Sequence, residues 1–556
     1  MTIRCLAALA VLIASAPAMA QTPPGPSALT SSISGIVKEK TTGAPLKDYR
    51  ISTNVKTTGA NGNSTTKTVS ATTDEQGHYR LADLPPDQYN LRAQSPRGFT
   101  GSMSRLVTVA GGDLNSIDFN FTLTGTITGK VLDENKEPVP GLFVLLVSKE
   151  YYLGSVGYFL RGASTTNDQG IYSLSSVEAG HDFYLVTDIR RRNSPAHSEV
   201  PLNPKMRRPV PMRTWYPSSP DREGAAPLQL RSGEHREGVD IEVKKSPSYC
   251  VAGIASTPNG PGPLRVDIEG LQPSSGVSNG GGMFMATTGT TTGNDGEYRF
   301  CDLYPGSYRL TVAERNPGPD STWAIATIAI ADRDLADVNL STVPGVSLDA
   351  EVVLEGPLPQ TPVAIKPVIG LTPLLRTQMP GEKSTVRPDI PGTQTISGML
   401  LDDYGIRATL TAPGLYIKDI TYAGRSVRFE ALHLGSAIAG TGLRVTVGQD
   451  GATLTAKVAD KDGNPVADST ILVMPAGVTS EGDLAARIAS GQTDQAGQYK
   501  SATLAPGKYF IVATSDSFDQ TPESIGKLWQ SHTRFQEVEL GPSGTAQVNL
   551  QPVGIR

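Results

Sequence analysis

The 556-residue sequence has few charged side chains, few aromatic side chains and no long apolar segment after its first 20 residues. Charged residues make up 19% and aromatic residues 6%, whereas there are 58 glycines and 42 prolines. This composition excludes coiled coils and other proteins built from long helices, because glycine and proline interrupt helices. The net charge of −5 gives no general attraction to nucleic acid. Since no later window holds about 18 uninterrupted apolar residues, we expect no transmembrane anchor in the mature chain.

The first 20 residues have the pattern of a Sec signal peptide. Arg4 precedes an apolar run from Leu6 to Ala16, and Ala18-Met19-Ala20 fits the small-x-small cleavage pattern. The run is shorter than the roughly 20 residues that cross a bilayer as a helix. We therefore expect residues 1–20 to be removed and residues 21–30 to form a linker, which makes the mature protein an exported one, periplasmic or extracellular.

A short motif, Thr-x3-Gly-x-Tyr, occurs four times along the chain. It is typical of a tight turn, in which an Asp or Asn side chain accepts nearby backbone N–H groups, glycine takes a positive φ and tyrosine opens a strand. Ten residues beyond three of these tyrosines lies a second tyrosine, after a proline-containing turn that joins two strands. The four copies are Thr73–Tyr79, Thr166–Tyr172, Thr292–Tyr298 and Thr493–Tyr499.

Strands of alternating apolar and polar residues open and close each repeat. A fifth, degenerate copy appears when residues 396–408 are aligned with residues 81–93, because the Leu/Met, Asp, Tyr and Arg-Ala positions match. Short strands broken by Gly, Pro and Asn turns predict an all-β protein of about five tandem antiparallel β-sandwich modules, each of roughly 90 to 120 residues. We number them module 1 (31–124), module 2 (125–245, with a basic and aromatic insertion at 188–233), module 3 (246–343), degenerate module 4 (344–448) and module 5 (449–556). Helical patches at Glu481 to Ile488 and Pro522 to Trp529 are expected to decorate module 5.

The repeated motifs resemble those of the carboxypeptidase regulatory-like domain. Gly-x-Val, a proline, Thr-Asp-x-x-Gly-x-Tyr and Leu-x-Pro-Gly-x-Tyr follow one another in the same order as in that family. The resemblance covers nearly the whole mature chain. It implies a transthyretin-like Greek-key sandwich, grouped also with carbohydrate-binding-like and Cna-B-like folds, and a mainly non-catalytic accessory or adhesive role.

The sequence offers no coherent catalytic or metal-binding set. None of the six histidines is followed by glutamate at the third position, as a carboxypeptidase zinc site would require, and the histidines are scattered singly. We therefore predict no catalytic residues, no metal and no cofactor, and hence a protein that is not an enzyme.

Two groups of side chains in module 2 are suited to contact a ligand. Aromatic rings stack on sugar rings, and guanidinium groups pair with carboxylates or phosphates, so an acidic envelope polysaccharide would suit both groups. The alternative is that the aromatic residues plug the open end of the sandwich and that the basic run is a solvated loop. The predicted sugar-contacting residues are Tyr151, Tyr152, Tyr158, Phe159, Trp215 and Tyr216, and the predicted anion-contacting residues are Arg190, Arg191, Arg192, Arg207 and Arg208.

The two cysteines of the mature chain, Cys250 and Cys301, both lie in module 3. If Val251 and Phe300 face the core, strand alternation turns both thiols outward, and an oxidising compartment would favour a disulfide between them. The alternative is a pair of unbonded, partly covered thiols.

Two hypotheses for function follow from these features. The first is a non-enzymatic exported protein that binds carbohydrate or serves in adhesion, with an envelope or extracellular polysaccharide as its partner. The alternative is a structural spacer or scaffold, or an accessory to an outer-membrane transporter, that acts through contacts with an envelope protein. Neither hypothesis involves nucleic acid.

Overall fold

The computed structural model confirms the all-β class. Most described residues are in strands, two α-helices are present among them, and no helix in this part of the chain is long and apolar enough to cross a membrane. By their contacts, the described residues form two compact units, of which the first comprises residues 31–38, 45–58, 64–96 and 102–119 and the second the other described residues. The structure describes residues 31–40, 42–58, 64–96, 102–189, 207–271, 288–314, 321–357, 366–374, 384–434, 442–516 and 518–555.

The predicted signal peptide, together with Arg190, Arg191 and Arg192, lies outside the described residues.

The second unit contains a separate hydrophobic cluster within each of the predicted modules 2 to 5. The module names are kept below for description, and their boundaries stay predictions.

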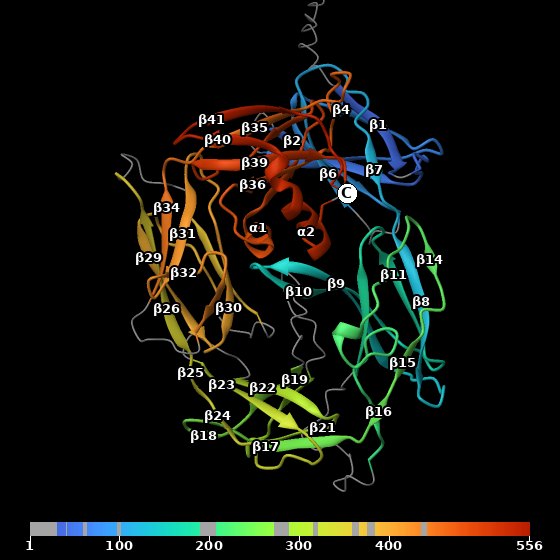
Figure 1. Ribbon diagram of the computed structural model, residues 1–556, viewed down its shortest axis with the longest axis vertical. Coiled ribbons are helices and arrows are strands. Elements are labelled where there is room, and N and C mark those ends of the chain that lie inside the picture. The colour runs from blue at the N-terminus through green and yellow to red at the C-terminus, as the bar shows by residue number, and fades with distance from the viewer. Residues whose placement is uncertain are drawn as a thin grey trace, which may run out of the picture. The chain divides into compact units, whose positions relative to one another are not determined.

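Module 1 is built from two facing sheets, with strand orders β4-β1-β7 and β3-β2-β5-β6 (Figure 1). Alternate residues of β1 are buried, as its apolar pattern predicts, and Ile33 pairs with Leu81 of the neighbouring strand. Ile51 and Leu91 come from the second sheet and are also fully buried, so the core lies between the two sheets. The strands are β1 (Ser31–Glu39), β2 (Arg50–Thr58), β3 (Ser64–Thr72), β4 (His78–Leu84), β5 (Asp87–Gln94), β6 (Ser102–Val109) and β7 (Phe119–Phe121).

Module 2 repeats this plan with sheets β11-β8-β14 and β10-β9-β12. The described part of its insertion, residues 207–233, packs back on the module, since Trp215 pairs with Val186 and Leu228 with Phe183. The elements are β8 (Gly125–Asp133), β9 (Leu142–Tyr152), β10 (Ser155–Thr165), β11 (Ile171–Val177), β12 (Phe183–Ile189), β13 (Val210–Pro211), η2 (Arg222–Gly224), β14 (His235–Arg236), β15 (Ile241–Val243) and β16 (Lys245–Ser246).

Modules 3 and 4 are also pairs of sheets with a core between them. Module 3 contains β17 (Tyr249–Thr257), β18 (Gly260–Pro261), β19 (Leu264–Leu271), β20 (Thr288–Thr291), β21 (Glu297–Leu303), β22 (Gly306–Glu314), β23 (Thr322–Ile330), β24 (Leu340–Ser341) and β25 (Val343–Pro344). Module 4 contains β26 (Val346–Leu354), β27 (Val368–Pro373), β28 (Thr385–Val386), β29 (Gly392–Met399), β30 (Asp403–Thr409), β31 (Tyr416–Tyr422), β32 (Arg425–Ser426), β33 (Ala431–His433) and β34 (Leu443–Gly448).

Module 5 adds the two α-helices, close to where the sequence predicts them. The side chain of Ser480 caps α1, and Thr521 caps α2 with Pro522 in its first turn. Ile525 and Leu528 of α2 are fully buried against the sheet that contains β36 and β39 (Figure 1). The elements are β35 (Thr453–Val458), β36 (Thr470–Pro475), α1 (Glu481–Arg487), β37 (Ala489–Gln492), β38 (Gln498–Lys500), β39 (Gly507–Thr514), α2 (Pro522–Ser531), η3 (His532–Arg534), β40 (Gln536–Leu540) and β41 (Thr545–Leu550).

The second tyrosine of modules 1, 3, 4 and 5 forms the same local hydrogen bond in each. Its hydroxyl donates to the backbone carbonyl four residues earlier, which fixes the turn before the strand, as a tyrosine corner does in other β-sandwiches. The degenerate copy in module 4 has this bond too, which supports the alignment of residues 396–408. The donors and acceptors are Tyr89 to Pro85 (2.7 Å), Tyr308 to Tyr304 (2.7 Å), Tyr404 to Leu400 (3.1 Å) and Tyr509 to Ala505 (2.8 Å).

The first tyrosine is tied to the glycine of the opening strand. In module 2, the hydroxyl of Tyr172 donates to the Val239 carbonyl oxygen at 2.6 Å, and that oxygen lies only 1.9 Å from where a Cβ on Gly129 would be. Glycine is therefore required for the closing segment to approach the opening strand. Module 1 has the same arrangement with Gly35, Ile117 and Tyr79, and module 3 with Gly253, Val338 and Tyr298.

Candidate functional site

Three of the six predicted sugar-contacting aromatics are buried inside module 2. Tyr158, Phe159 and Trp215 are 5%, 8% and 4% exposed, and the Tyr158 and Trp215 ring centroids lie 5.1 Å apart. Tyr216 is half-buried against the main core of the module. The rings of Tyr158, Trp215 and Tyr216 fill space between the strands and the insertion, as the alternative interpretation holds, whereas the Phe159 ring centroid lies 6.2 Å from that of Tyr152.

The other two aromatics lie at the tip of the β9–β10 hairpin and contact other modules. The Tyr151 N–H donates to the Gln520 carbonyl at 2.8 Å, and its hydroxyl donates to the Glu481 carboxylate at 3.2 Å, both in module 5. The Tyr152 hydroxyl lies 2.9 Å from the position of a Cβ on Gly405 of module 4. Both tyrosines therefore serve contacts between modules.

The predicted anion-contacting arginines have different environments. Arg207 is 1% exposed in its side chain and makes two 2.7 Å contacts with Asp334 of module 3, while Arg208 is exposed. The hydrogen bonds from Arg207 lower the pKa of Asp334 below its usual value, against the effect of partial burial. Arg207 thus joins the insertion to module 3 through a bidentate ion pair, and its guanidinium is already occupied.

Cys250 on β17 and Cys301 on β21 are bonded through their sulfurs at 1.98 Å, with the Cα atoms 4.1 Å apart. Val251 and Phe300 lie in the core of module 3, and Cys250 is outside that core cluster but is still only 2% exposed, with Arg299 Nη2 3.6 Å from its sulfur. The register shift near this disulfide places an extra residue on β21, because Tyr249 and Val251 pair with Leu303 and Phe300.

A cavity of about 460 Å³ lies where module 2 meets module 5. One wall comes from β9, β12 and the turn before β12, and the other from the end of β39, α2 and the segment between them. Its polar and aromatic lining includes Lys149, His181, Asp182, Tyr184, Gln229, Thr514, Asp516, Phe518, Asp519, Thr521, Glu523, Ser524 and Lys527.

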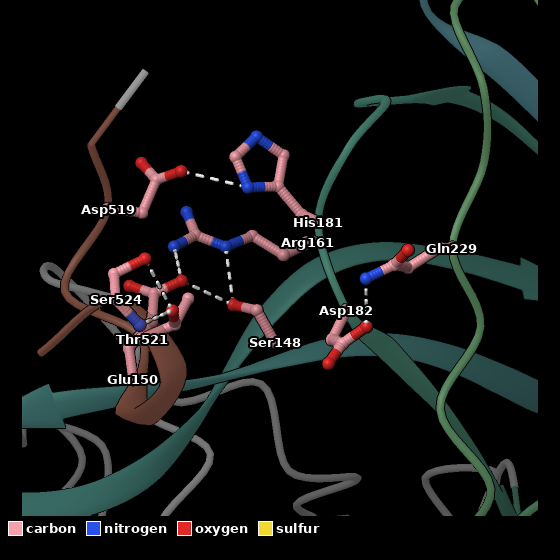
Figure 2. A network of polar contacts seen from close by, with 9 residues as sticks. All are labelled: Ser148, Glu150, Arg161, His181, Asp182, Gln229, Asp519, Thr521 and Ser524. Atoms are coloured by element: carbon pink, nitrogen blue, oxygen red, sulfur yellow. Dashed lines mark hydrogen bonds and ion pairs between the residues drawn. The ribbon is translucent and has the colours of Figure 1, made fainter. Parts of the chain in front are cut away.

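An ion pair across the junction helps to hold the two walls. His181 Nδ1 lies 2.8 Å from the Asp519 carboxylate (Figure 2). This hydrogen bond raises the pKa of His181, against the opposing effect of partial burial, and lowers the pKa of Asp519. The pair therefore favours a charged imidazolium facing a carboxylate.

A second polar group, entirely within module 2, lies beside that pair. Arg161 of β10 donates to Ser148 of β9 at 2.8 Å and forms an ion pair with Glu150 (Figure 2). The strand pairing of β9 with β10 and these side-chain contacts fix the hairpin, so it presents an ordered edge to module 5.

The lining has the chemistry of a site for a polyhydroxylated ligand. Asp182 accepts a hydrogen bond from Gln229 at 2.7 Å, so its carboxylate is oriented (Figure 2). Asp516 accepts from the Ile555 N–H at 3.2 Å. Carboxylate and amide groups bind hydroxyls, and the rings of Tyr184 and Phe518 offer apolar surfaces for a sugar face.

Sequence reasoning missed this site because its walls are far apart in the chain. The hydrogen bond between Tyr151 and Glu481 joins residues 330 positions apart, and no local motif marks either wall. Among the residues that the structure describes, no group of three or more His, Cys, Asp or Glu side chains is arranged to hold a metal ion.

Comparison with known proteins confirms the predicted resemblance. Residues 32–124, which correspond to module 1, match the family model of the carboxypeptidase regulatory-like domain. No curated protein matches the chain. The protein is thus a multi-module β-sandwich protein whose residues 32–124 match the carboxypeptidase regulatory-like domain.

Solved structures of low identity are also similar to the chain. The Bacillus anthracis TIE protein is 10% identical, with 91% of this chain and 69% of that chain covered and a TM-score of 0.16. The full-length major pilin RrgB from Streptococcus pneumoniae is 9% identical, with 95% and 100% covered and a TM-score of 0.18. At these values the likeness carries no argument about function.

Proposed function

We propose that this protein is a non-enzymatic, exported binding protein that takes a carbohydrate into the cavity between modules 2 and 5. The observation that carries the proposal is the lining of that cavity, which combines oriented carboxylate and amide groups with two aromatic rings. Its volume of about 460 Å³ is in the range of small-molecule sites, which occur preferentially where domains meet.

The fixed walls of the cavity favour binding. Two contacts attach module 2 to module 5, one from Tyr151 and the other between His181 and Asp519. A ligand that enters a preformed site does not have to order the side chains around it, so less of its interaction energy is lost.

The test is binding of the mature chain to a panel of glycans, followed by two charge-removing variants. Asp182→Asn and Asp516→Asn should each weaken a bound glycan about tenfold, because each removes a charge-assisted acceptor. Asp462→Asn, in an exposed turn of module 5, is the matched control and should leave affinity unchanged. The proposal would be refuted if the intact chain bound no glycan of the panel, or if all three variants bound with equal affinity.

A scaffold function is the second candidate, and the ion pairs between modules favour it. Arg207 pairs with Asp334 between modules 2 and 3, and Arg309 lies 3.5 Å from Asp402 between modules 3 and 4. Three of these four side chains are at least nine-tenths covered, an arrangement that holds modules at fixed angles. A chain that binds no glycan but crosslinks to one identified envelope protein would favour this function.

A further inference from the structure

A second cavity, of about 350 Å³, lies between modules 4 and 5 and carries a different chemistry. Its lining includes Arg428 and Phe429 from module 4 and Arg487 and Lys508 from module 5. Tyr416 and Tyr509 also line it, one from each module. Basic and aromatic side chains are therefore concentrated here.

Two guanidinium groups lie near the same aromatic ring. The Arg428 Cζ is 4.7 Å from the Phe429 ring centroid, and the Arg487 Cζ is 5.8 Å from it. Partial burial lowers the pKa of Arg428, and the positive charge of Arg487 acts in the same direction, whereas Asp419 and the two tyrosines oppose them. The positive charge of Arg428 is thus held in an unfavourable position.

The ion pairs around the cavity leave Arg428 without a carboxylate partner. Arg487 contacts Asp483 one helical turn away at 3.2 Å, and Lys508 contacts Glu537 at 2.9 Å. Arg428 donates instead to the backbone carbonyl of Lys418 at 2.8 Å. No carboxylate in the described ranges lies within ion-pair distance of Arg428, and a partly buried cation of this kind gains stability from an incoming anion.

The tyrosines are compatible with an anion. Burial, followed by the hydrogen bond to Asp450, raises the pKa of Tyr416 to about 12, so its hydroxyl stays neutral at physiological pH. The Tyr509 hydroxyl donates to the Ala505 carbonyl at 2.8 Å, which fixes that ring at the cavity wall.

We propose that the cavity between modules 4 and 5 binds an oxyanion, a carboxylate or a phosphate, carried on a small ring-bearing molecule such as an acidic sugar. The forked guanidinium of Arg428 binds two oxygens of such a group in one plane, and Arg487 adds a second positive charge. The aromatic walls cover the ring that carries the anion. This inference uses none of the residues of the cavity between modules 2 and 5 and does not depend on the proposed function.

The test is calorimetric titration of the intact mature chain with glucuronate, glucose 6-phosphate, inorganic phosphate and glucose. The first two should bind, and added salt should weaken them. Glucose should not bind at the same concentrations. Binding of glucuronate alone identifies a carboxylate site, and binding of glucose 6-phosphate with inorganic phosphate identifies a phosphate site. Failure of all three anions, or equal binding of glucose, overturns the inference.

Variants locate the bound anion. Arg428→Gln should lower affinity about tenfold or more, and Arg428→Lys should lower it less, because it keeps the charge but loses the fork. Arg487→Gln removes a positive charge from the same cavity but from α1, and its effect on anion affinity tests the inference if a change at Arg428 impairs folding. Arg425→Gln, an exposed arginine on β32, is the matched control. Unchanged affinity in both Arg428→Gln and Arg487→Gln overturns the inference, whereas Asp182→Asn should leave anion binding intact.

Discussion

Substitution of Gly129 by alanine should open module 2 locally. The new Cβ would lie 1.9 Å from the Val239 carbonyl oxygen and 2.4 Å from its carbon, both backbone atoms. Because ordinary contacts of this kind exceed 3.0 Å, the strand and the closing segment must separate by about 1 Å. That movement lengthens the 2.6 Å hydrogen bond from Tyr172, whose ring is only 1% exposed.

The magnitude follows from these contacts. Loss of the hydrogen bond between a buried hydroxyl and a buried carbonyl lowers stability by about 1–3 kcal/mol, and the remaining steric crowding lowers it by about 1 kcal/mol more. The free energy that closes this part of module 2 should fall by about 2–4 kcal/mol. Hydrogen exchange of β8 and β15 peptides should then be about 30- to 700-fold faster where exchange occurs through this opening.

A matched control is present in the same module. At Gly162 on β10 the nearest atoms lie 3.7 Å from the position that a Cβ would take, an ordinary van der Waals distance, so Gly162→Ala should change exchange little. In a double-mutant cycle, Tyr172→Phe should add almost nothing to Gly129→Ala, because the bond is already broken. Equal effects of the two glycine substitutions, or full additivity with Tyr172→Phe, would refute the reasoning.

Three further predictions concern other contacts. Because the pKa of His181 is raised in the folded protein, its ion pair stabilises the fold fully below the unfolded-state pKa of about 6.5, and this stabilisation is lost as the pH rises through the folded-state pKa. The pKa of Asp519 is lowered, so its carboxylate adds stability above about pH 4. The amides of the β9–β10 hairpin, with their exchange rates corrected for the intrinsic pH dependence of exchange, should therefore be protected by about 0.5–1 kcal/mol more at pH 5.5 than at pH 8.5 after allowance for solvent screening, and His181→Ala should abolish this difference in protection. Paired replacement of Cys250 and Cys301 by serine should destabilise module 3 by about 2–4 kcal/mol, since their bond closes a loop with a sequence separation of 51, and a melt unchanged by reductant would contradict this. Tyr404→Phe should cost module 4 about 1 kcal/mol in denaturant unfolding, and no loss would show that its hydrogen bond is not formed.

The repeated motifs made the fold predictable because they act locally. Tyr89 reaches a carbonyl four residues away, and the turn before Tyr79 is held by Asp74, which accepts from the His78 N–H at 2.8 Å. Such contacts depend on spacing along the chain, and spacing is visible in a sequence. Even the degenerate copy in module 4 could be found in this way.

The candidate sites could not be predicted, because they depend on how modules meet. The ring chemistry of Tyr151 and Trp215 predicts contact with a sugar, but in the structure Tyr151 contacts module 5 and Trp215 is buried inside module 2. Arg428 and Arg487 belong to different modules, and only the folded chain places both near Phe429. Residue type alone does not distinguish a packed arginine from a binding arginine.

The β9–β10 hairpin also constrains the order in which the polypeptide matures. Its tip rests on segments synthesised hundreds of residues later, so a nascent chain must carry Tyr151 and Tyr152 uncovered until the carboxyl-terminal region emerges. Premature termination ahead of module 5 would leave these two aromatic rings uncovered, and such fragments should be the ones most prone to chaperone capture or proteolysis.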